Sequence, residues 1–205
     1  MTDLQTLQDD ISFLKGLAIE GRSPSVMGGA MLVAAGSAYG VASLGHWAIV
    51  SGAAPVPTPW ILPILWTSAT VGFLAAVTVI KRRFRDAAPA NGSGRASAMA
   101  WQGVGWAIFT LAACMAIVAW QTHSDAPLRM FPSIILALYG MAWSVAAAVS
   151  KVRWTGLAAV GSFAAAILAA LFSGSPASFL LFAAALVALA IVPGLAMIRQ
   201  GRAAS

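Results

Sequence analysis

The chain has 205 residues, of which 60% are hydrophobic and 9% are charged, and its formal net charge is +6 at pH 7. A soluble domain carries about 25% charged residues, so this composition excludes a water-soluble globular protein and predicts an integral membrane protein. The basic residues gather at the ends of apolar runs, as membrane topology requires, which argues against nucleic acid as a partner.

Residues 2–20 are predicted to form an amphipathic helix ahead of the first membrane span, within a cytoplasmic segment that covers residues 1–22. Apolar residues recur there at intervals of three and four and therefore share one face: Leu4, Leu7, Ile11, Leu14 and Ala18. An interfacial helix on the membrane is the favoured interpretation. Its polar face is acidic, with Asp9 and Asp10, which weakens attraction to lipid and favours docking on a protein partner. A short coiled-coil contact is the alternative.

Six apolar runs follow, each long enough to cross a hydrocarbon core of about 30 Å, which needs roughly 20 helical residues. Helices satisfy their own backbone hydrogen bonds in lipid, and the runs lack the alternation of barrel strands. The sequence therefore predicts an all-α integral membrane protein, a six-transmembrane-helix bundle within residues 23–200, followed by a cytoplasmic tail over residues 201–205. The spans are predicted at residues 26–50, 60–80, 99–120, 130–150, 154–172 and 177–198.

The segments between these spans alternate in charge. If the N-terminus is cytoplasmic, eleven of the twelve Lys and Arg residues lie in cytoplasmic segments, and only Arg129 lies outside. This bias predicts a multi-pass protein of the bacterial inner (plasma) membrane with both termini in the cytoplasm. The longest cytoplasmic loop begins with basic residues and continues through residues 88–97, whose small and polar composition predicts a flexible linker.

Two histidines are the candidates for a metal or haem site. The sequence places His46 near the outer end of the first span and His123 just past the outer end of the third. Imidazole binds iron, copper and zinc, so a paired site at the outer face is one interpretation. The favoured interpretation is that both histidines meet water at the interface, because His123 lies outside the spans and only Asp125 adds a carboxylate nearby. The single cysteine, Cys114, excludes a cysteine-rich site, and we expect no metal and no cofactor.

Small residues at four-residue spacing predict close contacts between helices. Gly36 and Gly40 form one such ladder in the first span, and Gly140 and Ser144 begin a second in the fourth span. A neighbouring helix can approach a glycine until the backbones touch, so we expect the first span to pack against the fourth through these residues. A subunit interface, and hence an oligomer, is the alternative role of the ladders.

The two tyrosines of the chain, Tyr39 and Tyr139, each precede a glycine and stand at matching places in the first and fourth spans. We expect them to lie near each other at the centre of the bundle. This similarity between the first and fourth spans is a weak sign of a 3+3 inverted repeat, an arrangement found in many transporters. Together with Gln102 and Trp106, the tyrosines are the candidate lining of a cavity for a solute.

None of the six predicted spans contains Asp, Glu, Lys or Arg, which disfavours proton-coupled transport and hydrolysis inside the membrane. We therefore expect a small non-catalytic protein, an accessory or regulatory subunit that binds a partner in the lipid bilayer through residues 2–20 or through the small-residue faces. A small carrier or channel for a neutral or apolar solute is the alternative. A polar, water-accessible cavity at mid-membrane would favour the carrier, and a solid core would favour the subunit.

Overall fold

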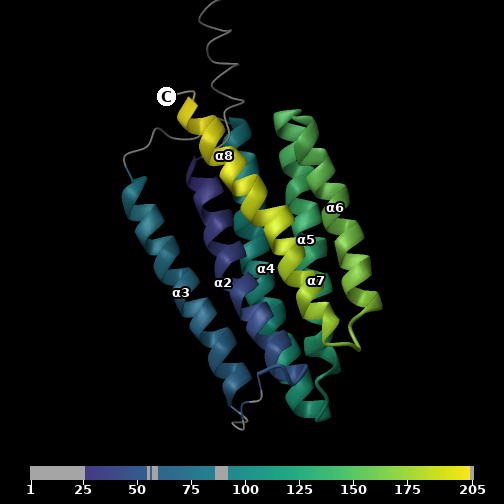
Figure 1. Ribbon diagram of the computed structural model, residues 1–205. Helices are drawn as coiled ribbons and strands as arrows, with labels where there is room; N and C mark the ends of the chain where they lie inside the picture. Colours follow the sequence, from purple (N-terminus) through teal and green to yellow (C-terminus); the bar gives the residue numbers. More distant parts are fainter. Residues whose placement is uncertain (1–25, 55, 57–59, 86–91, 204–205) are drawn as a thin grey trace, which may run out of the picture.

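The computed structural model describes residues 26–54, 56, 60–85 and 92–203 (Figure 1). Within this part of the chain every regular element is a helix, and no strand occurs. The amphipathic helix predicted over residues 2–20 lies outside the described residues.

Six helices are long and apolar enough to cross a membrane, so the prediction of an all-helical, multi-pass protein with six spans is confirmed. The last span changes its helical pattern part-way and is divided into three elements. The bounds are α2 (Val26–Val50), α3 (Ile61–Arg83), α4 (Gly92–Thr122), α5 (Ala126–Ser150), α6 (Arg153–Leu171), and then α7 (Ala177–Leu186), the π-helical η1 (Val187–Ile191) and α8 (Val192–Ala203).

Two helices begin earlier than the hydrophobic runs predicted. α4 begins at Gly92 instead of residue 99, and α5 begins at Ala126 instead of residue 130. The prediction of a flexible linker is therefore wrong over residues 92–97. A helix forms the same backbone hydrogen bonds in the headgroup layer as in lipid, so the apolar run marks the hydrocarbon and not the ends of the helix.

The helices form two groups of three. In the first group α2 is central, with α3 packed on one side and α7, η1 and α8 on the other. In the second group α5 is central, between α4 and α6. The last span also packs against α6, which joins the two groups, and α3 and α6 lie at opposite sides of the bundle (Figure 1).

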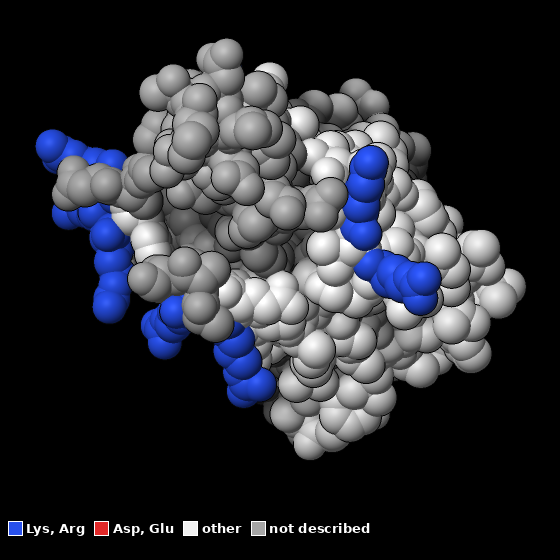
Figure 2. Space-filling view, turned by 90° about the horizontal axis from the view of Figure 1, so that it is seen from above, with Lys and Arg blue, Asp and Glu red and all other residues white. Residues whose placement is uncertain are grey.

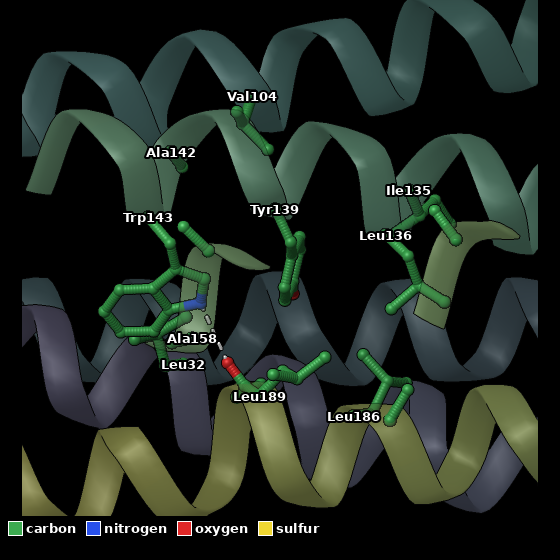
Figure 3. Close-up of a cluster of buried hydrophobic side chains, with 14 of the residues drawn as sticks. Leu32, Val104, Ile135, Leu136, Tyr139, Ala142, Trp143, Ala158, Leu186 and Leu189 are labelled. Carbon is green, nitrogen blue, oxygen red and sulfur yellow. Dashed lines mark hydrogen bonds between the residues drawn. The ribbon is translucent and has the colours of Figure 1, made fainter. Parts of the chain in front are cut away.

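The core lies where α5, α6 and the last span meet α2. Figure 3 shows the side chains of α5 pointing toward Leu186 and Leu189 of the last span. The largest side chains with less than 2% exposure in this core are Trp143, Phe182, Leu136 and Leu186. By contrast, no residue of α3 is buried, and within the described part of α4 only Val104 is buried. α3 and α4 are therefore outlying helices, each held mainly by one neighbour.

Candidate functional site

His46 lies at a junction of three helices. Its Nδ1 accepts a hydrogen bond from the indole N–H of Trp66 on α3 at 2.9 Å, and its ring stacks on Phe179 of α7 with the ring centroids 3.6 Å apart. An imidazole nitrogen that accepts a hydrogen bond carries no proton, so His46 is neutral here with its proton on Nε2. The side chain is half-buried, and it fastens α2 to both α3 and α7.

The structure thus separates the two histidines in role. His46 was expected to face water and instead packs among aromatic rings, whereas His123 is exposed directly after α4 and has a left-handed backbone with φ of 51°. Within the described residues, no group of three or more His, Cys, Asp and Glu is arranged to hold a metal ion. His46 packs against Phe179 and makes one specific polar bond, with Trp66.

Tyr39 lies seven residues before His46 and so on the same side of α2. Its ring contacts Trp66 and Phe73 of α3, with centroid distances of 6.4 and 5.6 Å. The hydroxyl of Thr70 donates to the main-chain carbonyl of Trp66 at 2.8 Å within α3. One face of α2 therefore holds α3 through aromatic contacts and the hydrogen bond between Trp66 and His46.

Tyr139 occupies the corresponding place in the second group. It is only 6% exposed and stands edge-on to Trp101 of α4, with centroids 5.2 Å apart. Trp101 also contacts Trp143, which contacts Trp154 of α6. This row of rings joins α4, α5 and α6.

The four residues expected to line a cavity do not share one. Gln102 and Trp106 are exposed on the outer face of α4, where Trp106 is 68% exposed, and Tyr139 is buried. The two best-formed hollows of the described part of the chain are shallow surface grooves, and none of the four residues lines either of them. One groove, of about 400 Å³, lies between α2 and α3, and the other, of about 390 Å³, lies between α6 and the last span.

The backbones of α2 and α8 approach each other closely at two glycines. A Cβ atom added to Gly29 would lie 2.6 Å from the main-chain oxygen of Gly194, and one added to Gly194 would lie 2.7 Å from that of Gly29. Gly36 faces the same span, since an added Cβ would lie 2.6 Å from Ile191. At Gly40 an added Cβ would meet no atom within 4 Å. Gly36 of the first ladder therefore packs on the last span. The prediction that this ladder packs on α5 is wrong.

The second ladder serves a different pair of helices. A Cβ atom on Gly140 would lie 2.6 Å from the ring of Phe163 on α6. Ser144 is exposed, and its hydroxyl donates to the carbonyl of Gly140 within its own helix at 2.7 Å. Close packing at Gly140 thus belongs to the contact between α5 and α6.

A polar contact that was not predicted from the sequence lies in the middle of the core. The indole N–H of Trp143 donates to the main-chain carbonyl of Leu189 at 3.1 Å (Figure 3). Pro193 has no N–H, so it cannot donate a hydrogen bond to the main-chain carbonyl of Leu189, four residues earlier. Leu189 lies within η1. The signal in the sequence is a proline inside an apolar span, which frees a carbonyl for a donor on another helix.

Comparison with known proteins finds no matching family model, no significantly similar curated protein and no significantly similar solved structure.

One end of the bundle is strongly basic. Figure 2 looks down on this end and shows Lys and Arg side chains along its rim, with no Asp or Glu in view. Of the ten Lys and Arg residues that the structure describes, nine belong to this end: Lys81, Arg82, Arg83, Arg85, Arg95, Lys151, Arg153, Arg199 and Arg202. The tenth, Arg129, lies at the opposite end and pairs with Asp125 at 2.7 Å.

Proposed function

We propose that this chain is a non-catalytic accessory or regulatory subunit that binds a second membrane protein through the outward face of α4. The two outlying helices support this role. None of the apolar stretch of α3 and 6% of that of α4 is buried inside the bundle, against 33 to 44% in the other four spans. Helices that contribute so little to the core of their own chain leave a long surface for another helix.

The observation that carries the proposal is a stripe of exposed residues on α4. Its members recur at alternating intervals of four and three residues, and we call them the α4 stripe: Gln102, Trp106, Phe109, Ala113, Ala116 and Trp120. This is the spacing at which two helices pack side by side in a left-handed pair, the commonest geometry of transmembrane bundles. The stripe places large aromatic rings beside small alanines, which suits knobs-into-holes packing against a partner helix.

Gln102 gives the α4 stripe a polar end. Its carboxamide is exposed and can both donate and accept hydrogen bonds. A hydrogen bond of this kind between membrane helices contributes about 0.6 kcal/mol on average, so it selects the register of a partner more than it sets the affinity. The partner proposed here is therefore a single apolar helix with a polar residue near the basic end of the bundle.

Site-specific photo-crosslinking in the native membrane tests this proposal. A photoreactive residue at Phe109, in the middle of the α4 stripe, should form an adduct with one protein, identified by mass spectrometry. The matched control is the same residue at Ile167, an exposed apolar position on α6 with 64% exposure, which should give no protein adduct. Ala113→Leu together with Ala116→Leu should abolish the adduct. An adduct with a second copy of this chain would show that the α4 stripe is a homo-oligomer interface and not the site of a different partner. Crosslinking to lipid alone would exclude both a partner protein and a homo-oligomer at this face.

A small carrier or channel for a neutral or apolar solute is the second candidate, and the neighbour relations of the helices favour it. Exchanging the first three spans with the last three carries the pair α2 and α3 onto α5 and α6, and the pair α2 and last span onto α5 and α4. These two relations match an inverted repeat, whereas the contact between α6 and the last span has no comparable counterpart between α3 and α4. A cysteine at Tyr39 tests it: rapid reaction with a water-soluble maleimide would favour the carrier, and protection would favour the subunit.

For the orientation, we propose that the basic end faces the cytoplasm of a bacterial inner membrane, which places both termini on the cytoplasmic side. Nine of the ten described basic residues at one end support this assignment, because loops rich in Lys and Arg remain in the cytoplasm.

A further inference from the structure

The groove between α6 and the last span, here called the α6–α8 groove, is apolar along its whole length. Its volume of about 390 Å³ lies within the range of about 300–1,000 Å³ that is usual for small-molecule sites. The lining residues are Trp154, Leu157, Ala158, Ala188, Leu189, Val192, Pro193 and Ala196. Such a lining suits a hydrocarbon chain.

Two arginines stand at the end of this groove that is nearest the basic end of the bundle. Arg199 lies three residues after Ala196 and therefore on the same side of α8, one turn beyond the lining. Arg153 directly precedes Trp154 and opens α6. Both side chains are exposed, and they belong to the two helices that form the groove, beyond its lining toward the basic end of the bundle.

The groove together with the turn that leads to Arg199 spans about one leaflet of a bilayer. From Ala188 to Arg199 the helix rises about 16 Å at 1.5 Å per residue, and half of a hydrocarbon core is about 15 Å. We propose that the α6–α8 groove binds an anionic phospholipid from the leaflet at the basic end. One acyl chain lies along the apolar lining, and the phosphate lies between Arg153 and Arg199.

Trp154 lines the groove with its apolar ring, while its indole N–H lies beneath the surface. Its indole N–H is buried and has no partner among the described residues. Roughly 90% or more of buried polar groups in proteins have a partner, but this nitrogen lies behind the apolar wall of the groove and is not exposed to its interior.

The groove between α2 and α3 provides a comparison within the same chain. It has a similar volume, about 400 Å³, and is lined by Ser37, Ala38, Val41, Ala42, Leu65, Ser68 and Ala69. Along α3, Lys81 is twelve residues from Ala69, and α2 contains no Lys or Arg. A hollow of equal size without cations at its mouth should not select an anionic lipid.

Native mass spectrometry of the full-length protein in detergent tests the site with phosphatidylglycerol and phosphatidylcholine at equal concentration. The protein should retain phosphatidylglycerol in preference to phosphatidylcholine. Arg153→Gln and Arg199→Gln should each weaken retention about fivefold, the effect of one basic residue beside an anionic lipid. Ala196→Leu should reduce retention without any change of charge, because the larger side chain fills the groove.

Two control variants separate the groove from general attraction to a basic surface. Arg82→Gln removes a cation of the same end on α3, and Ala69→Leu fills the comparison groove; both should retain phosphatidylglycerol as the unaltered protein does. An equal loss from Arg82→Gln, or unchanged retention in Arg153→Gln, Arg199→Gln and Ala196→Leu, overturns the proposal. The melting temperature in lipid-free detergent shows that each variant is folded.

Discussion

The indole N–H of Trp143 on α5 donates a hydrogen bond to the main-chain carbonyl of Leu189 in the last span, with a donor–acceptor distance of 3.1 Å. Trp143 is 1% exposed, so this polar bond lies in the apolar core and connects the two groups of helices. Hydrocarbon offers a freed carbonyl no water as an alternative partner, and the cost of leaving it unpaired is high. The bond therefore fixes the register of the last span against α5.

Trp143→Phe should destabilise the protein by about 1–3 kcal/mol, the cost of leaving a buried carbonyl without its donor. The measurement is the free energy of unfolding in detergent, obtained from a denaturant titration. Trp106→Phe is the matched control, because it makes the same chemical change on an exposed face and should alter stability by about 0.5 kcal/mol or less. Pro193→Ala in the Trp143→Phe background returns an N–H to the helix and should recover part of the loss. An absence of recovery would show that ring volume, and not the hydrogen bond, is responsible.

His46→Ala should lower the melting temperature, because it leaves the indole N–H of Trp66 unpaired and removes the ring stacked on Phe179. A loss of about 1–3 kcal/mol is expected for the unpaired donor. His46→Asn keeps an acceptor near the position of Nδ1 and should lose less. His123→Ala changes an exposed residue and should leave stability within about 0.5 kcal/mol. If His46→Ala and His123→Ala behave alike, His46 does not fasten α3 to the bundle.

The fold was predictable because lipid leaves a chain few choices. Each apolar run has to satisfy its backbone as a helix, and its length has to match the hydrocarbon core, so composition and run length were sufficient for six spans. The ends of α4 and α5 were less predictable, since residues 92–97 are polar enough for a loop and still continue the helix. Polarity marks the edge of the lipid there, while the helix ends where its hydrogen-bond ladder stops.

The partners of individual residues were not predictable for a physical reason. A glycine allows close approach by any helix, so Gly36 and Gly140 indicate tight packing without indicating which helix provides it. The same holds for His46, whose neighbour Phe179 belongs to a span that begins more than 100 residues later. Such pairs depend on the order of helices around the bundle, which local spacing does not record.

Cysteine labelling should show the basic end in the cytoplasm. In a Cys114→Ser background, which removes the native thiol, a cysteine at Ser93 should react only when the reagent reaches the cytoplasm, and one at Ser175 should react in intact cells. The physical reason is the retention of Lys- and Arg-rich segments on the cytoplasmic side during insertion. Reaction of both positions from the same side would contradict the six-span arrangement, and reversed sides would contradict the orientation alone.

Substitution of single glycines by alanine distinguishes glycines that contact a neighbouring helix from glycines that were only predicted to do so from their spacing. Gly29→Ala places a Cβ 2.6 Å from the main-chain oxygen of Gly194, and backbone cannot move aside as a flexible side chain can. Overpacking of this kind costs about 1–3 kcal/mol, so the melting temperature in detergent should fall. Gly40→Ala adds its methyl group where no atom lies within 4 Å, and alanine favours a helix over glycine by up to about 1 kcal/mol. Gly40→Ala should therefore be neutral or stabilising. A larger loss at Gly40 than at Gly29 would mean that α2 turns its other ladder position toward a neighbour, as the sequence alone had predicted.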